Sequence, residues 1–582
     1  MNNFTKRCVA AFASLTMAGT LCAAGAVTVS SVAWASKPGV NQGGGSQPQG
    51  GNPSQAAVPE KAPWELGTAA STKTGSITIN KWEDEVEGGK QKKSKPVSGA
   101  EFTVKKVTQI GNDTIDLTKY ADWVKVANQI DKLNKNTATV TTETGNGTTK
   151  NTSGTDQGAQ KGVAKFENLK IGLYQVKETT VPKGYSASES KPFYITIPMI
   201  EKGDGDKVVY NYNPSVDPKN KNLKKCVKKT ADTSETVGAG DKIKYTISAE
   251  LDKMKEAGAA DLTAADFNGY SVVDLAPADA FTTYDASVVK TVNVGTDDTN
   301  KSNTELKNED SKKYYEVGTA TDVPAVTSGD NQDVARKKIP ITFTEEGRKK
   351  LAEEANKTAN AGKTVKVFVT LEFTLKDSTT LGNSTVTNKG GLIPSHGDGD
   401  NPDVVTGDEN QKVEFLKFKI KKVSATDNKG LQGGKFVIFA KETDAKACTA
   451  ELNKANGDVT NKCGVNSSRS AFGEKESAKD TGLTEEYSLV KDNKTFYIVE
   501  TAAPAGYIRN PDPVAVEAKD TNATYTFQNL PNKDNGFWFN LPKTGAAGVI
   551  LFALAGVCFV GAGFVVYIHR RKKEEEQAKL RA

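Results

Sequence analysis

The sequence predicts an all-β chain of three tandem β-sandwich domains. Short strand-like segments separated by turn residues run from about residue 70 to Pro531. A partial internal repeat places similar segments near the start and the end of this region. The composition is rich in lysine, threonine and asparagine, which favours narrow, solvated sandwiches over one wide core. Without the terminal signals described below, roughly 500 residues remain, enough for about three domains.

The individual elements follow from their residue patterns. Two short helical patterns are expected within the β region, near residues 118–133 and 345–357. The second has a capping-box pattern that starts at Thr342 and reaches Glu345. Representative strands are expected at residues 77–80, 193–197, 364–375 and 415–420.

The N-terminus has the features of a secretory signal. Lys6 and Arg7 precede an apolar stretch from Val9 to Val32, and residues 33–35 (Ala-Trp-Ala) offer a small-x-small cleavage site. We therefore expect residues 1–35 to be a signal peptide. Residues 36–70 are rich in Gly, Gln, Ser and Pro and are expected to form a flexible linker.

The C-terminus carries a pentapeptide, an apolar run and a basic cluster in that order. The pentapeptide is Leu541-Pro542-Lys543-Thr544-Gly545, the run extends over residues 546–568, and His-Arg-Arg-Lys-Lys follows. A run of about 23 apolar residues can cross a bilayer as a helix, and the basic cluster should stay cytoplasmic. This order resembles the cell-wall sorting signal of Gram-positive surface proteins. The resemblance implies that a sortase cleaves after Thr544 and passes its carbonyl to an amine, so membrane anchoring is transient.

Charge and residue usage exclude several classes of function. The 77 basic and 71 acidic residues are interspersed and give a formal charge of +6, so no nucleic-acid partner is expected. The only histidines are His396 and His569, so we expect no metal site, no cofactor and no Ser-His-Asp triad. In the exported part, Cys448 and Cys463 are expected to form a disulfide, and Cys226 to be a small buried residue.

The internal repeat identifies two modules of one kind. Each copy has a strand ending in lysine, then an L/V-x-G-[AG]-x-F segment, then a Y-x-V-x-E-T-x-x-P-x-G-Y-like box, which ends at Tyr185 in the first copy and at Tyr507 in the second. These motifs resemble the immunoglobulin-like CnaB modules of Gram-positive pilins, and the unit between them resembles the companion CnaA module. The resemblance implies three immunoglobulin-like domains at residues 71–219, 220–412 and 413–540, followed by the sorting signal at 541–582.

In such modules a lysine on the first strand bonds to an asparagine on the last strand, beside a Glu or Asp. The chemistry needs burial, because burial lowers a lysine pKa toward the nucleophilic neutral amine and raises a carboxyl pKa. For the third domain the resemblance implies Lys422, Asn529 and Glu500, with Lys421 as a rival lysine. Glu500 would be the catalytic acid that polarises the amide and relays protons.

For the middle domain the resemblance implies Lys229, Asn388 and the catalytic acid Asp274. The choice of lysine stays open, because three other lysines crowd the same strand: Lys224, Lys225 and Lys228.

The first domain keeps Lys81 and Glu178 but has no clear terminal asparagine. Asn211 and Asn213 are weak candidates, so we expect no internal bond in this domain.

The segment Val216-Asp217-Pro218-Lys219-Asn220 resembles the pilin motif, in which a lysine accepts the sortase acyl group. Asp217 departs from the family pattern, which usually has an aromatic residue there. Pro218 should keep its predecessor extended and remove one ladder donor, leaving Lys219 at a strand edge. The resemblance therefore implies that Lys219 of one subunit is linked to Thr544 of another.

The function expected from these features is that of a sortase-assembled pilus shaft subunit that supports adhesion at a Gram-positive cell wall, and not that of an enzyme. The expected partners are polymerising and housekeeping sortases, identical subunits joined head to tail, minor tip and basal pilins, peptidoglycan and a host surface receptor. The alternative is a wall-anchored adhesin that binds host matrix and never polymerises, for which Lys219 would have no use.

Overall fold

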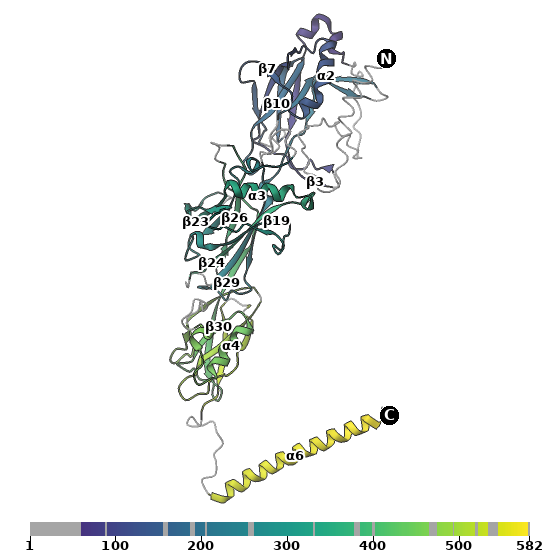
Figure 1. Cartoon of the computed structure of the whole chain (residues 1–582). Coiled ribbons are helices and arrows are strands. Elements are labelled where there is room, and N and C mark those ends of the chain that lie inside the picture. The colour runs from purple at the N-terminus through teal and green to yellow at the C-terminus, as the bar shows by residue number, and fades with distance from the viewer. Residues whose placement is uncertain are drawn as a thin grey trace, which may run out of the picture. The chain divides into compact units, whose positions relative to one another are not determined.

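A computed structural model describes residues 60–87, 90–154, 161–186, 192–203, 207–253, 261–329, 332–376, 384–397, 402–464, 474–492, 494–517, 519, 522–532 and 545–579. The expected signal peptide and the sorting residues 541–544 lie outside this part of the chain. The chain divides into two compact units, residues 1–416 with 488–494 and residues 417–487 with 495–582. Figure 1 shows the elements of both units, coloured along the sequence.

The first domain has a core between two β-sheets. A three-stranded sheet has the order β14-β1-β9, and a larger sheet has the order β11-β10-β5-β6, with β7 and β8 also paired to β5. Helix α2 covers this core with Trp123, Val126 and Leu133, and lies beside the strands in Figure 1. The bounds are β1 Thr74–Asn80, β2 Trp82–Glu83, β3 Val86–Glu87, β4 Lys90–Gln91, β5 Glu101–Ile110, β6 Asp113–Thr114, α2 Tyr120–Asn134, β7 Val140–Thr142, β8 Thr148–Asn151, β9 Val163–Lys170, β10 Gly172–Thr180, β11 Phe193–Ile197, β12 Met199–Lys202, β13 Val208–Asn211, β14 Ser215–Val216 and β15 Lys219–Asn220.

The expected linker is shorter than residues 36–70. From residue 62 the chain folds onto the first domain through two short 3-10 helices, Pro63–Glu65 and Gly67–Ser71. Trp64 holds this segment on the domain. Its ring packs edge-on against Tyr120, Trp123 and Tyr210 at centroid distances of 5.0, 6.0 and 5.7 Å. Aromatic pairs at these distances fix the segment to the domain surface.

The middle domain is a sandwich of two sheets with orders β20-β19-β24-β17-β16-β28 and β21-β23-β18-β26-β27, and β22 also pairs with β23. Every second residue of β17 is buried, from Ile243 to Ala249, as one buried sheet face requires. Cys226 is buried as expected, and burial raises the pKa of its thiol to about 12. The bounds are β16 Val227–Asp232, β17 Lys242–Glu250, β18 Ser271–Pro277, β19 Val289–Gly295, β20 Thr304–Glu305, β21 Tyr315–Val317, β22 Thr321–Val323, β23 Arg336–Phe343, α3 Glu345–Asn356, β24 Lys366–Thr374, β25 Thr385–Thr387, β26 Lys389–Ile393, β27 Val405–Thr406 and β28 Glu409–Asn410.

The expected helix near residues 345–357 is confirmed as α3, but its cap differs from the prediction. Thr342 lies in β23, and the N-cap is Thr344, whose hydroxyl accepts from the amide of Gly347 at 3.1 Å. Both threonines are residues that can cap a helix. Thr344 is the N-cap because Thr342 lies inside the strand, which continues to Phe343.

The third domain contains a sheet built on the long strand β29 and a second sheet of order β31-β30-β33-β34. Strand β29 pairs with β25 at residues 412–414 and, in parallel, with β35 at residues 418–424. Sequence patterns missed the helices α4 and α5, which carry the confirmed disulfide Cys448–Cys463 into a small core with Val437, Ala445 and Val499. The bounds are β29 Lys412–Ser424, β30 Lys435–Phe439, α4 Glu442–Leu452, α5 Val459–Cys463, β31 Lys475–Glu476, β32 Tyr487–Val490, β33 Thr495–Ala502, β34 Val514–Glu517 and β35 Ala523–Asn529.

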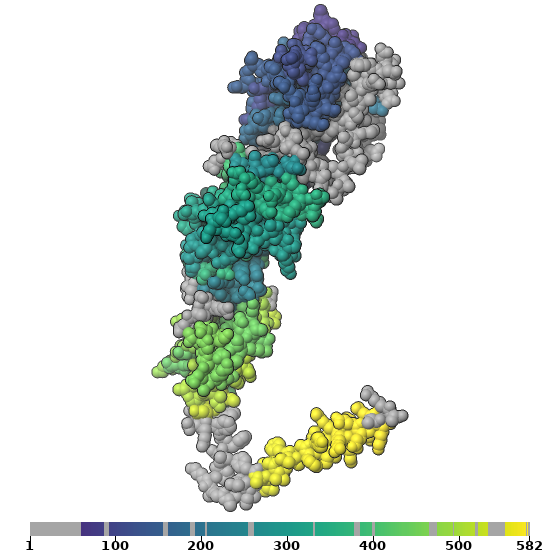
Figure 2. All heavy atoms as spheres, in the orientation of Figure 1, coloured from purple at the N-terminus to yellow at the C-terminus, as the bar shows by residue number. Residues whose placement is uncertain are grey.

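The C-terminal helix α6 spans Gly545–Lys579. Its segment Ala553–Gln577 is long and apolar enough to cross a membrane, with a mean hydropathy of 1.6. Phe559, Val560 and Phe564 are among the apolar side chains exposed on this helix, which is the yellow segment of Figure 2. Lipid would cover these side chains in a membrane-spanning helix.

Removing the disulfide should destabilise the third domain. The two cysteines are 15 residues apart, and closing a loop of that size contributes about 3 kcal/mol in the chain-entropy model. The double variant Cys448→Ala/Cys463→Ala is therefore expected to unfold at a lower temperature by scanning calorimetry. Wild-type protein treated with a reductant is the control and should show the same shift. An unchanged unfolding temperature in both would contradict this role.

Candidate functional site

A buried lysine lies beside a buried carboxyl and a buried asparagine in the third domain. Lys422, Glu500 and Asn529 are 0%, 0% and 3% exposed. The Lys422 Nζ lies 3.0 Å from Glu500 Oε1, and Asn529 Nδ2 donates to both Glu500 oxygens at 2.8 and 3.0 Å. The structure thus brings together the three residues expected for this domain.

Strand phase decides between the rival lysines of β29. Side chains alternate between the two faces of a strand, so Lys421 and Lys422 point in opposite directions. Lys421 is exposed and Lys422 is buried, where its ammonium lies over the rings of Phe527 and Phe436, 4.4 and 5.7 Å from their centroids. Burial lowers the pKa of Lys422 from 10.5 to about 8, although the Glu500 charge opposes the shift.

The middle domain contains a second such group. Lys229, Asp274 and Asn388 are 1%, 0% and 0% exposed, and Lys229 Nζ donates to Asp274 Oδ2. Asn388 Nδ2 lies 3.4 Å from the same oxygen. Within the described part of the chain, the buried atoms Asn388 Oδ1 and Asp274 Oδ1 have no hydrogen-bond partner. Such unpaired buried oxygens are rare in folded proteins, because each costs the free energy of a lost hydrogen bond.

Burial also distinguishes Lys229 from the other candidate lysines of this domain. Lys229 is the buried one, whereas its three neighbours Lys224, Lys225 and Lys228 are exposed. Burial lowers the pKa of Lys229 to about 8, against the opposing charge of Asp274. Burial raises the pKa of Asp274, which Lys229 and Asn388 partly offset. The pair is therefore shifted toward a neutral amine and a protonated acid.

The first domain has an asparagine that sequence reasoning missed. Asn220 is fully buried, its Oδ1 accepts from Lys81 Nζ at 2.8 Å, and its Nδ2 donates to Glu178 Oε1 at 2.9 Å. Lys81 Nζ also lies 3.0 Å from Glu178 Oε2. The expectation that this domain has no suitable asparagine is therefore wrong.

The two weak candidates of the first domain lie elsewhere. Asn211 donates to Glu201 at 2.9 Å, and Asn213 accepts from Ser76 at 2.9 Å. The signal that could have identified Asn220 was present in the sequence. It directly follows Lys219 in the pilin-motif segment, and Lys81 and Glu178 were already in place.

Strand order explains why these residues meet. In the first and third domains the last strand runs parallel to the first, because β14 and β15 pair with β1 and β2, and β35 pairs with β29. Lysine and asparagine therefore come from adjacent strands, and the acid comes from the other sheet, on β10 or β33. In the middle domain Lys229 lies on one sheet, while Asp274 lies on the other and Asn388 immediately precedes a strand of that other sheet. A bond there would join the two sheets.

Lys219 lies on β15, whose one pairing partner among the described strands is β2. Its side chain is 22% exposed, and Nζ forms an ion pair with Asp84 Oδ1 at 2.7 Å. The backbone amide of Trp82 donates to the carbonyl of Pro218 at 3.0 Å, which fixes the register of the segment. Unlike the three buried lysines, Lys219 has a partly exposed side chain at a strand edge.

Asp217 has a structural role in place of the expected aromatic residue. It accepts from Trp82 Nε1 at 3.0 Å and from Asn80 Nδ2 at 3.2 Å, and forms an ion pair with Lys93 at 2.6 Å. These contacts hold the segment before Lys219 against the first strand. Asp217 replaces the aromatic residue that the family usually has here. The segment is still held in place, because Trp82 supplies an aromatic ring beside it and donates to Asp217.

The comparisons with known proteins match three separate segments of the chain. Residues 60–221 match the N-terminal domain D1 of Gram-positive pilin subunits, residues 416–531 match a prealbumin-like fold domain, and residues 539–575 match the LPXTG cell wall anchor motif. The first match ends just after Lys219 and Asn220, and the third contains Thr544.

Whole-chain relatives are fimbrial proteins. The chain is 28% identical to the fimbrial subunit type 1 of Actinomyces viscosus, covering 83% of this chain and 86% of that protein. It is 26% identical to the fimbrial subunit type 2 of Actinomyces naeslundii, covering 84% and 86%. Among solved structures it is similar to the fimbrial protein FimP from Actinomyces oris, at 21% identity and a TM-score of 0.49, covering 79% of this chain and 98% of that one.

The pilin domain at the N-terminus, the prealbumin-like domain before the C-terminus, the wall-anchor motif and the apolar helix α6 occur in one chain. The chain therefore belongs to the Gram-positive pilins that carry an LPXTG cell-wall anchor.

Proposed function

We propose that this pilus shaft subunit is joined head to tail to copies of itself by an amide between Thr544 of one subunit and Lys219 of the next. We further propose that each of its three domains is closed by an internal lysine–asparagine amide. The observation that carries the second proposal is that in all three domains a buried lysine and a buried asparagine contact the same buried acid.

The joint between subunits would form by acyl transfer. A sortase cysteine attacks the carbonyl carbon of Thr544, the bond to Gly545 breaks, and the amine of Gly545 leaves with a proton. The Lys219 amine then attacks the thioester, the cysteine leaves as a thiol, and an amide remains. The partial exposure of Lys219 at a strand edge supports this role.

The internal bonds would form without an enzyme. The neutral lysine amine attacks the Cγ carbon of asparagine, and Nδ2 leaves as ammonia. The carboxyl that contacts both groups holds the amide and relays the proton from Nζ to Nδ2. Fixed contact in a buried site replaces a chance encounter in solution.

The expected result is a fibre that resists pulling. Contacts that repeat head to tail without closing a ring give an open filament. In the third domain the parallel first and last strands are held by ladder hydrogen bonds, each contributing about 1 kcal/mol. A covalent bond across them would bear the load instead. Polymerising and housekeeping sortases, minor tip and basal pilins, peptidoglycan and a host surface receptor are the proposed partners.

Intact mass tests the internal bonds. Each bond should remove one ammonia, about 17 Da, so the folded exported chain should be lighter by about 51 Da than its sequence. Glu500→Ala should restore about 17 Da and lower the unfolding temperature, and Asn220→Ala should restore the same mass in the first domain. Lys421→Ala is the matched control, since this exposed neighbour should leave the deficit unchanged. A mass equal to the sequence would refute all three bonds.

An unreacted third domain should become more stable in alkali. In Asn529→Ala the lysine stays free, and its folded pKa of about 8 lies below its ordinary 10.5. Between these pH values the unfolded state binds more protons, so the free energy of unfolding should rise with pH. Urea unfolding at pH 8 and pH 10 measures this difference. Wild-type protein, whose lysine would be an amide, should lack this contribution, and an equal pH dependence in both would argue against the bond.

Polymerisation tests the joint. Immunoblots of cell-wall extracts should show a high-mass ladder for the wild type and a single band for Lys219→Ala. Lys224→Ala, an exposed lysine in the same segment, should keep the ladder. A single band for the wild type would instead indicate a monomeric, wall-anchored adhesin.

A further inference from the structure

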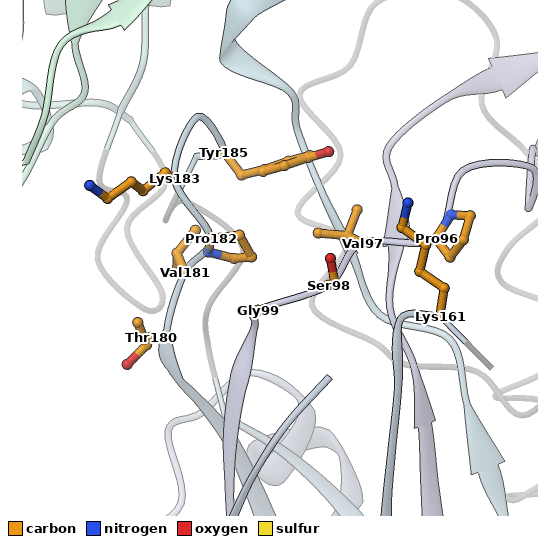
Figure 3. Close-up of a pocket in the computed structure, with 10 residues that line it drawn as sticks. All are labelled: Pro96, Val97, Ser98, Gly99, Lys161, Thr180, Val181, Pro182, Lys183 and Tyr185. Atoms are coloured by element: carbon orange, nitrogen blue, oxygen red, sulfur yellow. The ribbon is translucent and has the colours of Figure 1, made fainter. Parts of the chain in front are cut away.

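The first domain has a cavity of about 510 Å³ at its surface. Two turns line it, residues 96–99 and residues 180–185, together with Lys161. Figure 3 shows the Tyr185 ring reaching from the second turn toward the first, beside Pro182 and Val97. Its lining combines apolar residues, among them Val97, Val181 and Pro182, with the two lysines Lys161 and Lys183. A cavity of this size and lining can accept one or two aromatic side chains, which pack on apolar residues and attract nearby cations.

The walls of this cavity are already fixed by hydrogen bonds. The amide of Val97 donates to the carbonyl of Lys81 at 2.9 Å, and the Tyr185 hydroxyl donates to Glu83 at 3.2 Å. Tyr185 also forms a β-bridge with Asn222. A cavity held in this way needs no rearrangement to accept a ligand, which lowers the entropic cost of binding.

The cavity lies beside the proposed acceptor lysine. Trp82 pairs with Lys219 on one side and with Pro96 on the other. Neighbouring strands are about 4.8 Å apart, so the backbone of Pro96 lies about 10 Å from that of Lys219. A chain attached to the Lys219 amine would therefore begin next to the cavity.

The segment that precedes the sorting motif carries an unexplained aromatic run. Phe537-Trp538-Phe539 stands between the last described residue of the third domain, Asn532, and Thr544. Aromatic residues make up only 7% of the chain, so three in succession are unusual for an exported, hydrophilic protein. These residues lie outside the described part of the structure.

The lengths are compatible. Once Thr544 is bonded to Lys219, five to seven residues separate the joint from the aromatic run, which an extended chain spans with about 17–23 Å. The cavity lies within this reach. A covalent tether of this length also gives a high effective concentration, so weak intrinsic affinity suffices for occupancy.

We propose that the run Phe537-Trp538-Phe539 of one subunit docks, through one or two of its rings, into this cavity of the next subunit, beside the joint. This inference rests on the proposed bond between Thr544 and Lys219. The competing occupant of the aromatic run is the membrane surface, where aromatic residues also gather. Docking is favoured because cleavage after Thr544 separates the run from the membrane helix, and the finished fibre would otherwise expose both the run and the cavity.

Protection from chymotrypsin, which cleaves after aromatic residues, tests the docking in purified fibres. In wild-type fibres we expect cleavage at residues 537–539 to be at least about tenfold slower than in fibres of Val181→Asp, which places a charge in the cavity. Lys177→Asp is the matched control, since Lys177 is exposed on the strand leading to the same turn but does not line the cavity. Its fibres should stay protected. Equal cleavage in wild-type and Val181→Asp fibres would overturn the proposal.

Photo-cross-linking gives a second measurement that leaves the cavity intact. With a benzophenone amino acid in place of Trp538, irradiated fibres should yield cross-links to residues 96–99 or 180–185 of the neighbouring subunit. Cross-links to lipid alone, or to another protein surface, would overturn the proposal. If the wild-type chain forms no covalent ladder, the bond to Lys219 itself is absent and the docking falls with it. A ladder without protection or cross-links defeats the docking alone.

Discussion

Burial of a lysine amine against a carboxyl and an asparagine amide is the constraint on which each domain depends. A buried charge costs several kcal/mol unless it is paired, so the acid must accompany the lysine from the facing sheet. The acid in turn holds the asparagine, as the contacts of Glu178 and Glu500 illustrate. In each core, this one group of contacts therefore links the first strand, the segment that carries the asparagine and the sheet or strand that carries the acid.

The same three groups are arranged in two ways. In the first and third domains the lysine lies on or directly between the first strands and the asparagine lies on the last strand parallel to them, so only the acid comes from across the core. In the middle domain Lys229 faces Asp274 across the core, and Asn388 lies at the start of a strand in the sheet of Asp274. The same three residue types therefore meet in every domain, but the strand order decides what their bond would join. It would join two strands of one sheet in the first and third domains, and the two sheets in the middle domain.

Much of this organisation could be predicted from the sequence, because it depends on local patterns. Alternation and turn residues identified the sandwiches, and the repeated boxes identified Glu500 and the pair Lys421 and Lys422, of which Lys422 was preferred. The choice of Lys229 over its neighbours could not be made, since it depends on strand phase in a basic segment. Asn220 was missed for a different reason. Its position next to Lys219 was the available clue, but its burial arises from parallel pairing with β2, and a two-residue strand is too short to show that burial as an alternation pattern. Helices α4 and α5 were missed because the disulfide and a small core stabilise them.

The adjacency of Lys219 and Asn220 has a consequence for how force would travel through a fibre. With the proposed bonds in place, the shortest covalent route enters at Lys219, follows the backbone to Lys229, crosses to Asn388, continues to Lys422, crosses to Asn529 and leaves at Thr544. The first domain lies off this route, so its own bond would bear no tension and would only hold the acceptor strand in place. Three stretches of this route have no covalent bypass: residues 219–229, 388–422 and 529–544. A shaft under load should lengthen at these stretches first, and 388–422 is the longest of them.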